Sequence, residues 1–224
     1  MVVVLGSGGH TREMLGLLRI IDPKMYAHRT YIASSGDNFA KDRAREFERY
    51  IQSSSEERAE NHIFEDSSEA TEPSAEGVVA PATGLWDFNV VPRARKIHQS
   101  ILTTPFSAAQ CLFGCVKALN DAARASIVGP GEYPDVIVTN GPATAVMVIL
   151  ASLLLRFFGI APVWKMKIIY VESWARVKRL SLSGKILLHM NVCDAFIVQW
   201  RNLADSINGS GKRKRVQYME CIVK

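Results

Sequence analysis

Short apolar runs alternate with longer amphipathic runs along most of the chain. Apolar, strand-like runs lie at residues 2–5, 28–34, 87–91, 135–139, 167–171, 195–199 and 218–223. Helix-like runs lie between them at 10–21, 37–51, 97–127, 143–158 and 180–191, with a short one after residue 200. Short apolar runs separated by helical periodicity are typical of parallel strands covered by helices. The pattern predicts an α/β fold with a doubly wound, mostly parallel Rossmann-like sheet.

One segment interrupts this pattern. Residues 53–84 are rich in Ser, Glu, Ala and Pro, contain few large apolar residues and show no periodicity. We therefore expect one Rossmann-like domain over residues 1–224, with a disordered acidic insertion at 53–84. Between 56 and 76, eight acids accompany only Arg58, so this stretch carries −7 and the rest of the chain +12 of the formal total of +5. Positive charge outside residues 56–76 favours binding to nucleic acid, to an anionic membrane or to a phosphorylated ligand.

The stretch 145–164 has nearly the length of a bilayer span and a single charge, Arg156. Because Arg156 lies mid-stretch and Pro162 lies near its end, we expect a buried helix and not a span. Met1 leads directly into the first strand without the pattern of a signal peptide. The four cysteines show neither metal-site nor disulfide spacing, so we expect reduced thiols, no metal and no cofactor.

A glycine-rich turn joins the first strand to the first helix. It reads Gly6-Ser7-Gly8-Gly9 and is followed by His10. Such a turn brings backbone N–H groups and the positive end of a helix dipole to one point, which suits a phosphate or diphosphate. The third glycine of the dinucleotide fingerprint is replaced by Thr11, so that motif is not complete. The alternative is a tight turn without a ligand.

Polar residues follow several other strands. Since ligands of doubly wound folds bind beyond the carboxyl ends of the strands, we expect these residues to share one edge with the glycine turn. They are residues 34–38, Arg93 and Arg95, Asn140 with Gly141, residues 172–176 and residues 199–200. Arg93 and Arg95 are expected on the same side of a strand, where they contact phosphate or lipid head groups, or form ion pairs with the acidic insertion. Lys212–Arg215 suits an anionic lipid surface or nucleic acid.

The combination of these segments resembles a known family. It comprises residues 6–11, 92–95, 134–135 with 140–142, 170–177 with 180–185, and 198–200. The resemblance is to the acceptor-binding subunits of the eukaryotic UDP-N-acetylglucosamine transferase that adds the second sugar to dolichol-diphosphate-N-acetylglucosamine. It runs from residue 1 to about residue 207, apart from the insertion.

The resemblance implies the acceptor half of a two-domain GT-B glycosyltransferase, similar to the bacterial enzyme that glycosylates undecaprenyl-linked muramyl peptide. A separate subunit would bind the donor, and the reaction would be inverting, metal-independent and located on the cytosolic face of the endoplasmic reticulum. Family members usually carry a hydrophobic anchor before the first strand, which this sequence does not show. We therefore expect reversible adsorption to the membrane surface through basic residues and the apolar face of 97–119.

The resemblance also assigns roles to residues. Diphosphate binding falls to Gly6, Ser7, Gly8, Gly9, Thr11, Arg93, Arg95, Asn140, Gly141, Ser173 and Arg176. A histidine beside a diphosphate tends to be protonated, so we expect Glu172 as the catalytic base and His10 as a diphosphate contact. In the alternatives His10 is the base, or Glu172 or His10 only caps a helix.

Two other function classes stay open at this point. A self-sufficient nucleotide-sugar-dependent enzyme would need a second Rossmann half, or an acid about 20 residues after the glycines, where residues 29–31 offer none. A nucleic-acid-binding module would need a binding motif that the sequence does not show, so we expect no nucleic-acid partner.

Overall fold

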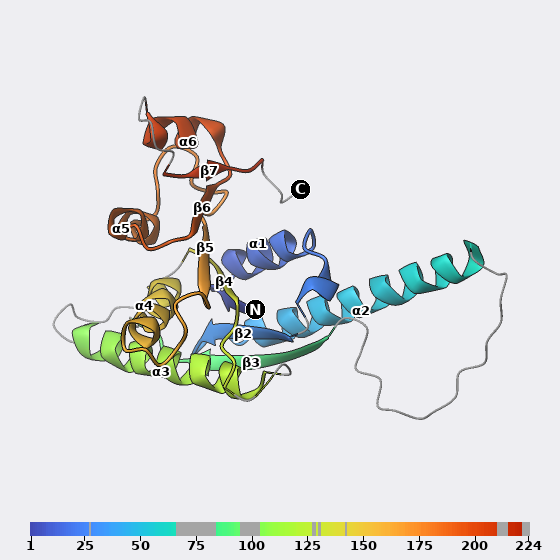
Figure 1. The fold of residues 1–224 in the computed structure, drawn as a ribbon. Helices are drawn as coiled ribbons and strands as arrows, with labels where there is room; N and C mark the ends of the chain where they lie inside the picture. The colour runs from blue at the N-terminus through green and yellow to red at the C-terminus, as the bar shows by residue number, and fades with distance from the viewer. Residues whose placement is uncertain are drawn as a thin grey trace.

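The computed structural model describes residues 1–26, 28–65, 84–94, 104–126, 129, 131–141, 143–209 and 215–220. Seven strands form one sheet in the order β3-β2-β1-β4-β5-β6-β7, and every pair is parallel (Figure 1). The strands are β1 (Val2–Leu5), β2 (His28–Ser34), β3 (Leu85–Val91), β4 (Val136–Asn140), β5 (Lys167–Val171), β6 (Ala195–Val198) and β7 (Gln217–Tyr218). The expected α/β class and parallel Rossmann-like sheet are confirmed.

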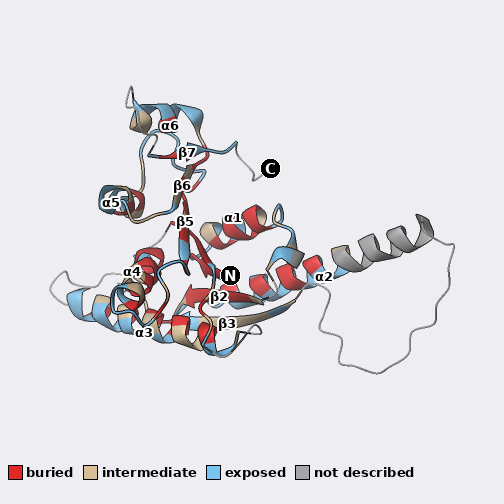
Figure 2. Ribbon diagram, viewed as in Figure 1, coloured by how far each residue is buried: buried red, intermediate tan, exposed pale blue. Residues whose placement is uncertain are grey.

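Helices cover the sheet on both faces. One face carries α1 (Gly9–Leu18) and α2 (Ala40–Glu65), which pack on Val3 and Leu5 of β1. The other carries α3 (Thr104–Arg124) and α4 (Ala143–Phe157), which pack on Val2 and Val4, and then α5 (Leu182–Met190) and α6 (Arg201–Asn208) over β5 and β6. A short helical turn, Pro23–Met25, precedes β2. Consecutive strand residues face opposite sides, so the central strands β1 and β4, which have a layer of helices on each face, are buried along their whole length (Figure 2).

A buried ion pair fastens α2 to the sheet. Arg29 of β2 donates to both carboxylate oxygens of Glu48, at 2.8 and 2.6 Å, and Tyr31 donates its hydroxyl to the same carboxylate at 2.5 Å. Burial lowers the pKa of Arg29, but the hydrogen bond and charge of Glu48 outweigh it, so the pKa lies above its usual value. The two buried charges therefore compensate each other. Removing one partner would destabilise the protein, because the other charge would stay buried without a counter-charge.

Most predicted elements lie within a few residues of the observed ones, and 167–171 matches β5. The helix predicted at 37–51 is too short, because α2 continues to Glu65. Residues 53–65, assigned to a disordered insertion, are therefore helical. Their run EERAE consists of strong helix formers, and local propensity extends the helix where no apolar periodicity marks it. The remainder, 66–83, lies outside the described residues. The strand predicted at 218–223 is too long, because β7 ends at Tyr218 and the next two residues are not in a strand, while 221–223 lie outside the described residues.

The apolar stretch 145–164 forms a buried helix only in part: it is helical as far as Phe157, as expected, but residues 158–164 form a turn whose large side chains are exposed. It contributes α4, whose Val148, Ile149 and Ala151 are fully buried beneath the sheet and the neighbouring helices. Across the part of the chain that the structure describes, no helix has both the length and the apolar character that crossing a bilayer requires. In the predicted run 97–127, α3 spans 104–124, and 97–103 lie outside the described residues.

Candidate functional site

The glycine turn opens onto solvent at the start of α1. Ser7, Gly8 and Gly9 are exposed, and Gly8 caps α1 with a φ of +59° and without a side-chain hydrogen bond to the helix. Thr11 is buried and donates its hydroxyl to the carbonyl of Gly6, so it braces the turn from inside. A first helical turn without a side-chain cap can accept an anion at its N–H groups.

Behind this turn lies a buried carboxylate that the sequence analysis did not single out. Glu13 accepts hydrogen bonds from the Trp174 N–H at 2.7 Å, from Gln199 Nε2 at 2.8 Å and from Asn140 Nδ2 at 3.4 Å. Burial opposes its ionisation, but the contact with His10 and these hydrogen bonds lower the pKa of Glu13 below its ordinary value. Glu13 is therefore ionised at neutral pH. The signal that could have revealed it is its position three residues after His10, on the same helix face.

His10 lies between this carboxylate and solvent. Its Nδ1 is buried, 3.6 Å from Oε2 of Glu13, while 36% of its side chain is exposed. The exposure therefore falls on the rest of the side chain, which carries Nε2. Asn140 donates to the His10 carbonyl at 3.1 Å, and the imidazole lies against Gly141. The structure thus brings together the first helix and the end of β4, as the shared edge predicts.

Two amides at this edge keep an unused acceptor. Asn140 and Gln199 are buried and donate to Glu13, yet Asn140 Oδ1 and Gln199 Oε1 have no hydrogen-bond partner within the described residues. Buried polar atoms are nearly always paired in folded proteins, and exceptions gather at functional sites. These two oxygens can accept hydrogen bonds from a polar ligand at the strand edge beside His10.

Glu172 has different surroundings. It is 1% exposed, and its carboxylate accepts from the Ser173 N–H at 3.1 Å and from the N–H and hydroxyl of Ser181 at 2.9 and 3.0 Å. Ser181 is the N-cap of α5 and accepts from the Gly184 N–H. Among the described residues, no hydrogen bond or ion pair joins the Glu172 carboxylate to His10 or Glu13. The geometry is that of the helix-capping alternative, because the carboxylate holds the start of α5.

The remaining candidates divide by exposure. Ser173 is buried, its hydroxyl accepting from a nearby N–H, whereas Arg176 is exposed. Arg93 donates to the Ser35 carbonyl at 2.6 Å and braces the turn after β2. It lies beyond Val91, where β3 ends, so the placement of Arg93 on a strand is wrong; Pro92 cannot donate to the strand ladder. Arg95 and residues 212–214 of the basic run lie outside the described residues.

A groove of about 830 Å³ begins at the glycine turn and runs between α1 and α2. Three arginines line it, Arg12, Arg19 and Arg43, together with the aromatic side chains of Phe39, Phe47 and Tyr50 and the carboxylates of Asp37 and Glu46. Positive charge therefore continues from the turn into the groove. In the described ranges, no three His, Cys, Asp or Glu side chains gather as a metal site requires.

Comparison with known proteins identifies the family. A family model described as "Oligosaccharide biosynthesis protein Alg14 like" matches residues 1–221. The chain belongs to the Alg14 family. This confirms the resemblance drawn from the motifs.

Several curated members of the Alg14 family are similar over nearly the whole chain. The Schizosaccharomyces pombe protein named "UDP-N-acetylglucosamine transferase subunit alg14" is 38% identical over 219 residues, which cover 98% of this chain and 81% of the relative. The protein of the same name from Aspergillus fumigatus is 38% identical over 87% of this chain and 92% of its own length. The rat protein is 32% identical over 92% and 77%. No solved structure was found to match the chain.

Proposed function

We propose that this Alg14-family chain is the acceptor-binding subunit of a UDP-N-acetylglucosamine transferase. It binds dolichol-diphosphate-N-acetylglucosamine and recruits a donor-binding catalytic subunit to the cytosolic face of the endoplasmic reticulum membrane. The product is the chitobiose-linked lipid used for N-glycosylation. The names of the relatives support the transferase. The single parallel sheet supports one half of a GT-B enzyme, which leaves the other half to the partner.

The observation that carries this proposal is the His10–Glu13 pair beside the open glycine turn. In the transfer, the acceptor 4-hydroxyl oxygen bonds to C1 of the donor sugar, and the bond from C1 to UDP breaks. UDP leaves with the electron pair, and the hydroxyl proton passes to a base. His10 can accept it at Nε2, and the negative charge of the ionised Glu13, 3.6 Å from Nδ1, stabilises the resulting imidazolium. A single displacement of this kind inverts the anomeric centre.

This proposal exchanges the roles expected from the sequence. His10 becomes the base because it is partly exposed and backed by a carboxylate, whereas the Glu172 carboxylate is buried and occupied by hydrogen bonds from Ser173 and Ser181. Glu172 becomes a positioning residue that holds the loop between β5 and α5. The diphosphate then falls to the N–H groups around Gly8 and Gly9 and to exposed cations such as Arg176.

The test is transfer with and without the partner. The purified chain is incubated with UDP-N-acetylglucosamine and a short polyprenyl-diphosphate-N-acetylglucosamine, alone or with a donor-binding subunit. We expect product only with the partner, and a β linkage by NMR from the α-linked donor. Robust turnover by the chain alone would favour the self-sufficient enzyme. A retained α linkage would contradict single displacement.

A further inference from the structure

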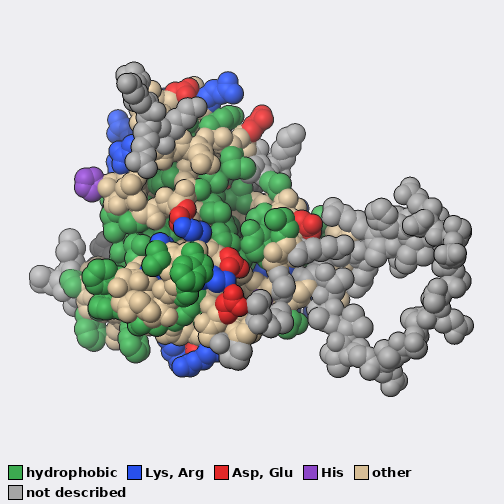
Figure 3. All heavy atoms as spheres, viewed as in Figure 1, with side chains coloured by type: hydrophobic (Ala, Val, Ile, Leu, Met, Phe, Trp, Pro, Cys, Tyr) green, Lys and Arg blue, Asp and Glu red, His purple; other side chains and the backbone are tan. Residues whose placement is uncertain are grey.

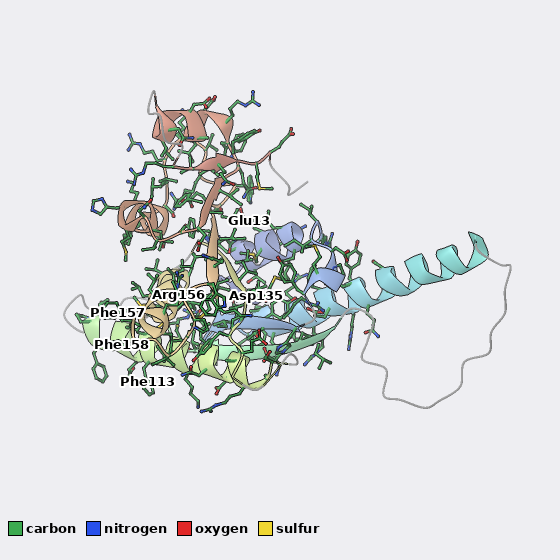
Figure 4. The ribbon with its side chains drawn as sticks, in the orientation of Figure 1. Glu13, Phe113, Asp135, Arg156, Phe157 and Phe158 are labelled. Carbon is green, nitrogen blue, oxygen red and sulfur yellow. The ribbon has the colours of Figure 1, made fainter. Side chains whose placement is uncertain are left out.

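Four groups of the candidate site meet at one carboxylate, that of Glu13, which is labelled on α1 in Figure 4. Oε1 of Glu13 accepts from the Trp174 N–H at 2.7 Å and from Gln199 Nε2 at 2.8 Å. Its Oε2 lies 3.4 Å from Asn140 Nδ2 and 3.6 Å from His10 Nδ1. Because all four groups contact the same carboxylate, both amide side chains lie close to the imidazole that we propose as the base.

The two amide side chains have used all their donors inside the protein. Asn140 Nδ2 donates to the His10 carbonyl at 3.1 Å and to Glu13 at 3.4 Å. Gln199 Nε2 donates to Glu13 at 2.8 Å and to the Glu172 carbonyl at 3.1 Å. An amide nitrogen carries two N–H groups, so both nitrogens are saturated. The remaining capacity lies in two buried oxygens, Asn140 Oδ1 and Gln199 Oε1, which have no hydrogen-bond partner among the described residues.

These two oxygens restrict the part of the ligand that can lie against them, because an acceptor needs an N–H or O–H group. An ionised diphosphate carries no donor, and a prenyl chain carries no polar atom. The sugar of the proposed acceptor does carry donors. In N-acetylglucosamine, the acetamido N–H at C2 and the hydroxyl at C3 stand next to C4, whose hydroxyl would lose its proton to His10. The sugar therefore places two donors beside the reacting hydroxyl, as the protein places two amides beside His10.

A half-exposed indole adjoins these amides. Trp174 is 50% exposed, yet its backbone is held on both sides. Its N–H donates to Glu13, and its carbonyl accepts from Trp200 Nε1 at 2.6 Å. The Arg176 N–H donates to the Ser173 carbonyl at 2.9 Å and closes the turn around it. The ring is therefore presented by an ordered loop, and an apolar wall beside a few fixed polar groups is the usual composition of a small-molecule site.

We propose that Asn140 Oδ1 and Gln199 Oε1 select the acceptor sugar, by accepting hydrogen bonds from its 3-hydroxyl and its acetamido N–H. Asn140 takes the 3-hydroxyl because it is bonded to the backbone of His10, and Gln199, which follows β6, takes the N–H. The Trp174 ring forms the wall against which the sugar packs. The inference rests on the proposed function and deepens it by naming the residues that determine sugar specificity. It assigns Asn140 to the sugar in place of the diphosphate.

The test compares two acceptors that differ only at C2 of the sugar. One is a short polyprenyl-diphosphate-N-acetylglucosamine, and the other carries 2-deoxyglucose, which has no donor at that carbon. We expect kcat/KM of the assembled enzyme to be about 10–100-fold lower with the deoxy acceptor, because Gln199 Oε1 stays buried and unpaired. Gln199→Met has no amide, so its two kcat/KM values should be nearly equal. A purely structural effect of this substitution would lower both values and keep their ratio.

The indole is tested by Trp174→Ala, which keeps the backbone contacts to Glu13 and Trp200. The KM for the acceptor should rise by about tenfold, with a smaller change in kcat. Trp164→Ala is the matched control, because Trp164 is 71% exposed and lies in the turn after α4. Hydrophobic side chains gather over the end of α4 in Figure 3, and Figure 4 shows this end, labelled at Phe157, well apart from Glu13. The control should keep the KM of the unmodified protein, and circular dichroism checks that each variant is folded.

Binding to the chain alone separates this inference from the transferase role. Isothermal titration calorimetry with the two acceptors, without donor or partner subunit, should show weaker binding of the deoxy acceptor. Such discrimination without any transfer by the complex would support the sugar site and contradict the transferase role. Transfer with equal kcat/KM for both acceptors overturns the inference alone, as does unchanged discrimination in Gln199→Met or a normal KM in Trp174→Ala. If neither acceptor binds, the acceptor-binding role and the inference both fail.

Discussion

The His10 imidazole occupies the space that a side chain at Gly141 would need. A Cβ on Gly141 would lie 2.8 Å from both Cε1 and Nδ1 of His10. Gly141 also has a φ of +69°, which residues with a Cβ rarely adopt. The end of β4 thus sets the position of the ring at the start of α1.

Gly141→Ala should lower kcat of the assembled enzyme by roughly tenfold or more. The new methyl group would push the His10 ring away from the position in which it can accept the proton of the acceptor hydroxyl. Backbone strain should also lower the free energy of unfolding by about 1–2 kcal/mol. Gly131→Ala separates the two effects, since Gly131 has a φ of +87° but open space around its Cβ position. That variant should lose stability and keep kcat. Equal loss of kcat in both would contradict the steric explanation.

His10→Ala should reduce kcat by about 10²–10⁴-fold, the usual effect of removing a general base. Glu172→Gln should act mainly through the loop that it holds, so KM for the acceptor and the melting temperature should change more than kcat. Both variants are measured with the partner subunit at saturating donor. If Glu172→Gln abolishes turnover and His10→Ala mainly raises KM, Glu172 is the base.

Glu13→Gln should weaken the fold in a pH-dependent way. The pKa of Glu13 is lower in the folded protein than in the unfolded chain, so its ionised form contributes stability above the unfolded pKa near 4.5. That contribution disappears as the pH falls through the folded value. At pH 7 the variant should be less stable by about 1–3 kcal/mol, and the two proteins should converge in acid. Urea denaturation between pH 3 and pH 7 measures this, and parallel curves would contradict it.

Glu48→Gln should destabilise the protein by about 3–5 kcal/mol, because it leaves the Arg29 guanidinium buried without its counter-charge. The double variant Arg29→Met/Glu48→Leu removes both charges and should lose less than Glu48→Gln alone. Urea denaturation at pH 7 gives the comparison. A double variant less stable than the single one would show that the pair itself contributes net stability.

The strand edge was predictable because parallel strands end together. This placed His10, Asn140, Gly141 and Glu172 in one region before any contact was known. What the sequence could not reveal is where each carboxylate points. The Glu172 side chain turns toward Ser181 because of the path that the loop takes after β5, and that path leaves no periodic signal.

Glu13 was hidden for a related reason. Its hydrogen-bond partners come from β4, from the loop after β5 and from the end of β6. These segments are far apart in the sequence, so the buried position of Glu13 is evident only in the folded structure. The turn after α4, residues 158–164, continues the apolar character of the helix, and hydropathy alone does not distinguish a buried Ile149 from an exposed Phe157. The extension of α2 depended on propensity, which carries less weight than periodicity in assigning boundaries.

The hydrogen bond from Gln199 to Glu13 has a consequence for biosynthesis. Glu13 leaves the ribosome early, whereas Gln199 is the last of its partners to be translated. Until β6 emerges, the carboxylate lacks one of its donors, so its burial is less well compensated. A nascent chain that stalls before this strand would keep Glu13 hydrated and His10 unsupported. The site therefore reaches its final structure only late in translation. Chains truncated before β6 should be incompletely folded and should be cleaved by quality-control proteases.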